Sequence, residues 1–242
     1  MLDTAARSAG LVLGGAFAVV ARARATVRPL HPRGEVCSGT LTRHGCPRPT
    51  GVAWLDEPGT DPVTVRLSDS AGLPRPLPDV RGLALRVPVG PAKVADLLLG
   101  STGTRPLARH VLVVTSAARP PMTSQVPFRS ARGPILLGAF PQPDAPAGPE
   151  GGLDAGFDDA GPRGSETGTE SFALGCAGLR GRWQHFATLT IPGAAVRPGA
   201  DDPSLRFDPV GNTVPGLPNY AWVERLRGPA YAAARHASPS AR

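Results

Sequence analysis

The chain has little lysine and few aromatic residues. Of its 26 basic residues only Lys93 is a lysine, so the formal net charge of +7 comes from arginines scattered along the sequence. Aromatic residues make up only 5% of the chain. A nucleic-acid-binding surface needs clustered basic residues interleaved with stacking aromatics. The sequence therefore predicts no nucleic-acid partner.

Cysteine is also scarce. Cys37, Cys46 and Cys176 are too few for a disulfide framework and include no C-x-x-C pair. We expect reduced thiols in a cytoplasmic protein. A pairing of Cys37 with Cys46 in an oxidising compartment stays open, because connectivity cannot be read from sequence. The histidines show no zinc-type clustering with each other or with cysteine.

No apolar run is long enough to span a bilayer. The run at residues 9–20 is shorter than the ~20 residues that a membrane helix needs. Its arginines mostly follow it, whereas a signal peptide places positive charge in front. We expect a helical arm over residues 1–27, and a weak signal sequence remains an alternative.

Short β-rich segments separated by glycine and proline dominate the rest of the chain. They predict an α+β, mainly β fold: an antiparallel β-barrel with N- and C-terminal helices, formed by a single domain over residues 28–242. The loop at about 141–170, rich in acidic residues and glycine, is expected to be mobile. Residues 96–100 are expected to form a short helical turn, and residues 229–235 a terminal helix. The expected strands are 36–41, 63–67, 83–87, 110–115, 171–174 and 186–191.

The most informative segment runs from Arg28 to Gly39 and has the form R-x-x-H-x-R-G-x-x-x-x-G. This pattern resembles the distal haem-side signature of catalases. The resemblance implies that His31 is the acid–base residue that takes a proton from a peroxide and returns it to the leaving oxygen. It also implies that Arg28 contacts a haem propionate.

A second segment, Val65-Arg66-Leu67-Ser68, resembles the V-R-F-S strand of the same family. The resemblance assigns Arg66 to a propionate, since a guanidinium suits a carboxylate. It assigns Ser68 to the orientation of the distal histidine. A strand with one surface arginine would also explain these four residues alone.

A third segment, residues 79–87, resembles the family's D-x-R-G-F-A-x-K-F sequence, and residues 96–100 stand where the family has D-L-V-G-N-N. The distal asparagine of the family is missing. Ser101 or Thr102 is expected in its place. Loss of one preorganised donor typically costs ~10²–10³ in rate, so weak dismutation is expected.

Near the end of the sequence, residues 206–209 resemble the family's F-N/D-P turn, and Arg227 with Tyr231 forms R-x-x-x-Y. In the family this pattern supplies a tyrosinate ligand to ferric iron and an arginine that keeps the phenol ionised. Tyr231 is therefore the expected iron ligand, and Arg227 its support. Arg235 is expected to reach a propionate. A tyrosine packed against the apolar side of a helix is the alternative.

Taken with this resemblance, the sequence predicts a short catalase-related protein that holds haem b. The expected activity consumes hydrogen peroxide or an organic peroxide with a small reductant. A homo-oligomer is compatible with the family. The alternative is a catalase-like scaffold without peroxide turnover, acting as a haem- or small-ligand-binding module. No other class of enzyme has a candidate motif here.

Overall fold

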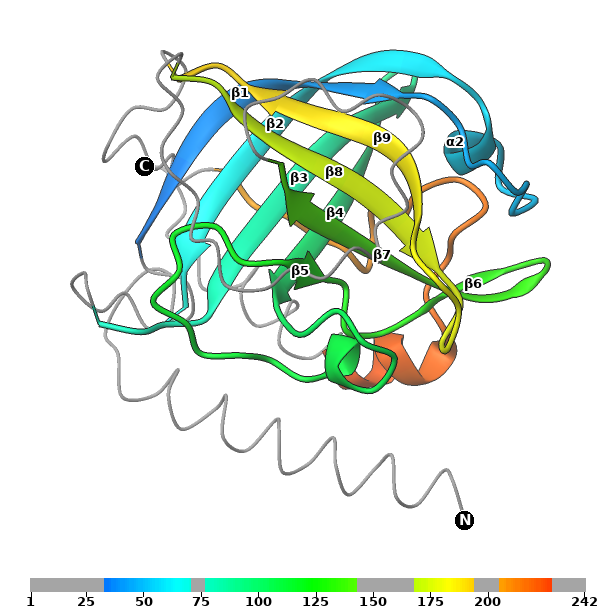
Figure 1. Cartoon of the computed structure of the whole chain (residues 1–242). Helices are drawn as coiled ribbons and strands as arrows, with labels where there is room; N and C mark the ends of the chain where they lie inside the picture. Colours follow the sequence, from blue (N-terminus) through cyan, green and yellow to red (C-terminus); the bar gives the residue numbers. More distant parts are fainter. Residues whose placement is uncertain (1–32, 71–76, 143–167, 194–204, 228–242) are drawn as a thin grey trace, which may run out of the picture.

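A closed antiparallel β-barrel forms the body of the protein (Figure 1). The structure is a computed structural model, which describes residues 33–70, 77–142, 168–193 and 205–227. The predicted mainly β fold with an antiparallel barrel is confirmed. The predicted helical arm at 1–27, most of the 141–170 loop and the predicted helix at 229–235 lie outside the described residues.

The sheet is built almost wholly from neighbours in sequence. Its order is β5-β4-β3-β2-β1-β9-β8-β7-β6, and an additional β5–β7 pairing closes the barrel. All the paired strands are antiparallel. The strands are β1 (Arg33–Arg43), β2 (Gly59–Asp69), β3 (Arg81–Gly90), β4 (Lys93–Ser101), β5 (Met122–Thr123), β6 (Phe128–Ser130), β7 (Gly133–Pro141), β8 (Glu170–Ala177) and β9 (Gln184–Ile191).

The inner face of the barrel is a packed apolar core. Successive residues of a strand point to opposite faces, so one alternating set of residues lines the interior. On β2, β3 and β4 the fully or almost fully buried residues Val65, Leu85 and Leu97 belong to this set, and they pair with each other in register. Burial of a side chain of this size contributes about 1.5–3 kcal/mol. The barrel interior is therefore filled by side chains.

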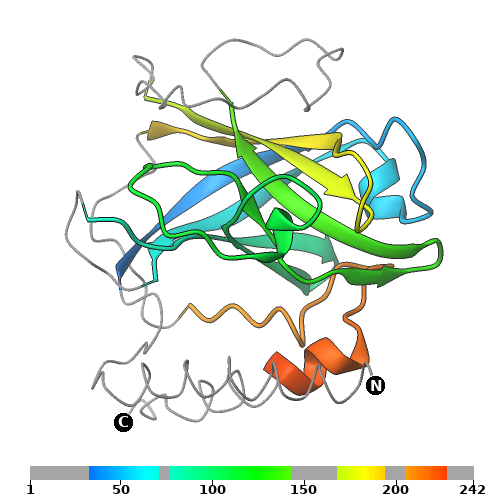
Figure 2. The same ribbon diagram turned by 60° about the horizontal axis from the view of Figure 1, so that its bottom comes forward.

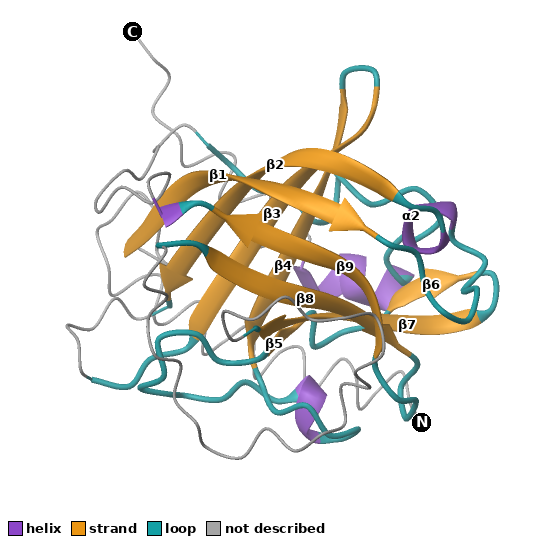
Figure 3. Cartoon of the chain, turned by 45° about the horizontal axis from the view of Figure 1, so that its top comes forward, coloured by secondary structure: helices purple, strands orange, loops and turns teal. Residues whose placement is uncertain are grey.

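The helices among the described residues lie outside the sheet, as Figure 3 shows. They include α2 (Ala53–Asp56), the 3₁₀ turn η1 (Ala108–His110) and the helical residues 221–227. Figure 2 shows this last helix below the barrel. None of the described helices is long and apolar enough to cross a membrane.

Two predicted elements are wrong. Residues 96–100 are not a helical turn but part of β4, because their backbone pairs with β3 over its whole length. Residues 110–115 are not a strand: His110 belongs to η1, and the residues after it make only isolated bridges. Val111 and Val114 there are 60% and 62% exposed, so no packing stabilises an extended strand.

A buried ion pair fastens the segment at 205–219 to the barrel. Asp96 is 1% exposed and accepts two hydrogen bonds from Arg86, at 2.7 and 2.8 Å. It also accepts from the backbone N–H of Asp208 at 2.8 Å and from the side-chain amide of Asn212 at 2.7 Å. The hydrogen bond to Asp96 raises the pKa of Arg86 above its ordinary value. The F-D-P turn is thus a structural clamp on β4.

Candidate functional site

The pairing register places Arg66 and Ser68 on the outer face of the barrel. Both alternate with Val65, which points into the core. Arg66 is 6% exposed and Ser68 is 9% exposed, although they lie on the side away from the barrel interior. The V-R-L-S segment therefore presents a buried guanidinium and a buried hydroxyl side by side on one strand face.

Glycines flank Ser68 across the sheet. In register, Ser68 lies opposite Gly34 on β1 and Gly82 on β3, and Gly82 lies opposite Gly100 on β4. Three of the four positions in this row have no side chain. The missing side chains let side chains from elsewhere in the structure lie against the backbone at Gly34 and Gly100.

Gly34 of the histidine motif lies against Arg66 of the V-R-L-S segment. A Cβ at this residue would lie 2.6 Å from Cζ of Arg66, so the guanidinium covers the position where a side chain would be. Only glycine leaves that space open. Gly34 comes three residues after His31 in the sequence. The two motifs, about 30 residues apart in the chain, thus meet on one face of the barrel.

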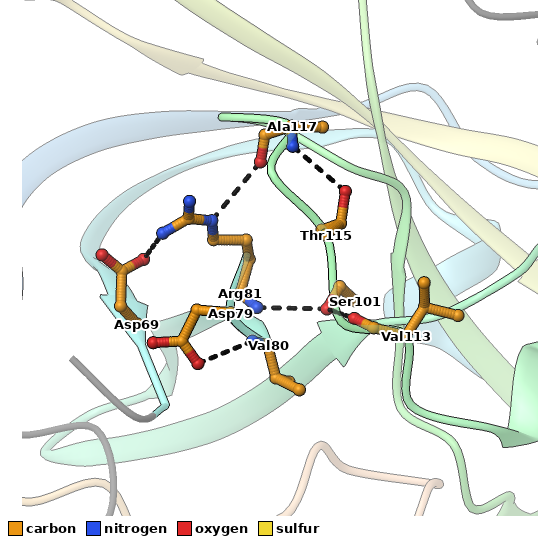
Figure 4. Close-up of polar contacts among 8 residues, drawn as sticks. All are labelled: Asp69, Asp79, Val80, Arg81, Ser101, Val113, Thr115 and Ala117. Carbon is orange, nitrogen blue, oxygen red and sulfur yellow. Dashed lines mark hydrogen bonds and ion pairs between the residues drawn. The ribbon is translucent and has the colours of Figure 1, made fainter. Parts of the chain in front are cut away.

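Ser101 does not share this face with Ser68. It follows Gly100 on β4 and therefore points to the opposite side of the sheet. Figure 4 shows its hydroxyl between two backbone groups: it accepts from the N–H of Arg81 at 3.1 Å and donates to the carbonyl of Val113 at 2.6 Å. With 0% exposure, the Ser101 hydroxyl is a structural link.

Thr102 is likewise engaged in structural hydrogen bonds. Its Oγ1 lies 3.1 Å from Oγ1 of Thr123, and the Thr123 hydroxyl donates to the carbonyl of Arg109 at 2.6 Å. Thr102 is 4% exposed. The two hydroxyls expected to replace the family's asparagine are thus both committed to the loops that follow β4.

The D-V-R-G segment also has a structural part in this region (Figure 4). Arg81 is buried, forms an ion pair with Asp69 and donates from Nε to the carbonyl of Ala117 at 3.3 Å. Asp79 is 3% exposed and forms a backbone bridge with Thr115. These contacts hold the 111–117 segment against the ends of β2 and β3.

Gln125 is a residue that sequence analysis missed. A Cβ at Gly100 would lie 2.5 Å from Nε2 of Gln125, so this side-chain amide covers Gly100, the β4 residue in the row that contains Ser68. Gln125 has a positive φ of 60°, which is uncommon for a residue other than glycine. Such backbone strain is often found at functional sites. No sequence signal marked Gln125, since its position depends on the turn after β5.

His110 lies against the same turn. Its Nδ1 is 2.6 Å from the backbone carbonyl of Gln125 and donates to it. Arg227 is the last described residue of the helix at 221–227, and its Nη2 lies 3.5 Å from the carbonyl of Ser124. The turn at 124–125 thus connects the edge of the outer face to the helix that precedes Tyr231.

The other predicted site residues lie outside the described residues: Arg28, His31, Tyr231 and Arg235. In the part of the chain that is described, no group of three or more His, Cys, Asp and Glu side chains could hold a metal ion. No protein-family model matches the chain, and no curated protein matches it.

Proposed function

We propose that the protein binds haem b against the outer face of β1–β4 and uses it to consume hydrogen peroxide or an organic peroxide with a small reductant. One observation carries this proposal. Arg66 and Ser68 are buried together on that face, and Gly34 of the histidine motif lies under the Arg66 guanidinium. The two motifs therefore contribute to one surface, which the adjacent strands β1 and β2 form.

The described residues suit the edge of a haem in part. A guanidinium matches a propionate carboxylate, and Arg66 lies on the same strand face as Ser68. Ser101 and Thr102 do not suit the role of a peroxide-positioning donor, because other groups already engage their hydroxyls. The Gln125 amide lies over Gly100, and its Nε2 donates one hydrogen to the carbonyl of Thr123 at 3.4 Å. An amide nitrogen carries a second hydrogen, so Gln125 is the better candidate for that role.

The chain geometry supports the pairing of His31 with Ser68. β1 begins at Arg33, whose backbone lies opposite Asp69, the residue after Ser68. His31 stands two residues before Arg33 in the sequence. We therefore assign its imidazole to the end of the barrel that carries the Ser68 hydroxyl.

The proposed roles follow from these positions. A bound haem would supply a redox-active ferric iron for cleavage of the peroxide. His31 takes the peroxide proton and returns it to the leaving oxygen, while Ser68 fixes the orientation of its ring. Tyr231 would hold the iron through its phenolate, with Arg227 four residues earlier in the sequence to favour ionisation of the phenol. The arginines Arg28, Arg66 and Arg235 hold the propionates.

Titration of the full-length protein with hemin tests this proposal. We expect a saturable Soret band with the high-spin pattern of a tyrosinate ligand, and Tyr231→Phe should change that pattern. The absence of a Soret band after haem supplementation would refute haem binding.

Variants of two serines on the outer face distinguish a role in peroxide consumption from a role in haem binding. Ser68→Ala should lower peroxide consumption by about 10-fold or more while the Soret band remains, because a general acid–base residue without its orienter works less well. Ser38, on the same outer face of β1 but exposed, offers the matched control. Ser38→Ala should leave both readouts unchanged, and equal losses in the two variants would contradict the role of Ser68.

The second candidate function is a haem- or small-ligand-binding module without peroxide turnover. The structural hydrogen bonds of Ser101 and Thr102 favour it, since neither hydroxyl is placed to polarise a peroxide. A Soret band without peroxide consumption, unchanged in His31→Ala, would support this module over the enzyme. Peroxide consumption that His31→Ala abolishes would support the enzyme.

A further inference from the structure

Two of the three cysteines are in contact across the barrel wall. Cys46, which follows β1, and Cys176, near the end of β8, have their Sγ atoms 3.0 Å apart. The backbone N–H of Cys46 donates to the carbonyl of Leu55 at 2.9 Å, and Cys176 lies in register between Leu137 and Gln184. Both backbones are therefore held in place, and a shift of about 1 Å would bring the sulfurs to bonding distance.

The two thiols differ in access to solvent. Cys46 is partly exposed, whereas Cys176 is 1% exposed. The hydrogen bond with Cys46 and burial raise the pKa of the Cys176 thiol above its ordinary value. A small oxidant can consequently reach Cys46 first. Cys176 lies beside Cys46 and is a slow nucleophile that reacts in a later step.

We propose that Cys46 and Cys176 form a disulfide when the protein meets a hydroperoxide. The Cys46 thiolate attacks one peroxide oxygen, the O–O bond breaks, and the other oxygen leaves as water or an alcohol. The resulting sulfenic acid is attacked by the sulfur of Cys176, which loses its proton, and a second water leaves. Two thiols are thereby oxidised by two electrons, and one peroxide is reduced. Haem takes no part in this reaction, so it does not rest on the proposed function.

The crosslink would have a large effect on the chain. The two cysteines are 130 residues apart in sequence, so the bond closes most of the barrel into one covalent loop. Closure of a long loop restricts the unfolded chain more than the folded one. It would also fix the segment that carries α2 to β8. Oxidation should therefore raise the midpoint of thermal unfolding by roughly 5–15 °C.

Peptide mapping of the full-length, haem-free protein tests the pairing. The protein is reduced, freed of reductant and treated with a small excess of hydrogen peroxide. We expect the three free thiols to fall to one, and protease digestion without reductant to yield one new species in which the peptide containing Cys46 is joined to that containing Cys176. The reaction should become faster as pH rises, since a cysteine sulfur attacks as its thiolate in both steps.

Variants separate this pair from the third cysteine. Cys37 lies on the inner face, and burial, followed by Glu170 and Glu35, raises its pKa to about 11. Cys37→Ala should still form the crosslink, whereas Cys46→Ser and Cys176→Ser should not form it or gain thermal stability. If a variant fails to fold, the mapping of the unmodified chain decides. A Cys37–Cys46 bond, or overoxidised Cys46 with Cys176 still free, would overturn the proposal.

Discussion

Ser68 and Ser101 lie near the ends of β2 and β4 in the same sheet, and both are buried, yet they belong to opposite faces. Ser68 is on the outer face beside Arg66. Ser101 points the other way and joins the backbones of Arg81 and Val113. A residue that matches a motif can therefore act together with the other motif residues only if the strand register places it on the same face.

The largest loss of stability is expected on the outer face, at the ion pair between Asp96 and Arg86. Asp96→Ala leaves the Arg86 guanidinium without its main partner and removes the acceptor for Asp208 and Asn212. Breaking a buried pair in this way costs about 3–5 kcal/mol. Urea unfolding would measure the loss. Asp61→Ala, which removes a single hydrogen bond to Arg43, should cost clearly less, and equal losses would contradict the anchoring role of Asp96.

The next largest effect is expected at Gly34, where the first two motifs share the outer face. Gly34→Ala would place a methyl group against the Arg66 guanidinium and should cost about 1–3 kcal/mol, with a larger loss of hemin affinity if Arg66 holds a propionate. Gly178→Ala is a suitable control, because its Cβ would meet nothing closer than 3.9 Å. Unfolding and hemin titration of both variants would show whether Arg66 depends on Gly34.

Ser101→Ala tests the opposite face. It removes both hydrogen bonds of a fully buried hydroxyl and should destabilise the fold by about 1–3 kcal/mol. Hemin binding and peroxide consumption per folded molecule should not change, in contrast to Ser68→Ala. A selective loss of peroxide consumption in Ser101→Ala would instead give Ser101 the role that the sequence suggested.

The smallest effect concerns β9, away from both serines. Burial lowers the pKa of His185, so the unfolded chain takes up its proton more readily than the folded one. Stability from this group is full above the ordinary histidine pKa of about 6.5 and is lost as pH falls. Urea unfolding between pH 7.5 and 5.5 should show this loss, and His185→Gln should flatten it. An unchanged slope in that variant would exclude His185 as its source.

The strands that were predicted correctly are those whose local pattern and tertiary pairing agree. Val63 and Val65 are buried β-branched residues with the partly exposed Thr64 between them, a pattern that is typical of a strand. Residues 96–100 have three successive leucines and a final glycine, a pattern that also fits a helical turn. Pairing with β3 decided between them: Leu97 and Leu99 enter the core, and Leu98 faces outward.

The site was less accessible to sequence analysis than the barrel. The neighbourhood of Arg66 and Ser68 was predictable because one strand holds both side chains two residues apart. Gln125 was not, since its amide reaches Gly100 through a turn with a positive φ that no sequence pattern announced. Ser101 was expected at the site because of its place in the linear motif. It stands one residue after Gly100, which faces outward, so its own side chain points to the opposite face.

The Asp96 clamp has a consequence for how the chain is made. The carboxylate sits on β4, and the backbone N–H of Asp208 that bonds it is 112 residues further along, so the ribosome must deliver that stretch before this donor exists. Until then Arg86, on the neighbouring strand of the same hairpin, is the partner of Asp96. The β3–β4 hairpin can therefore form early with its ion pair, and the segment at 205–219 covers that pair later.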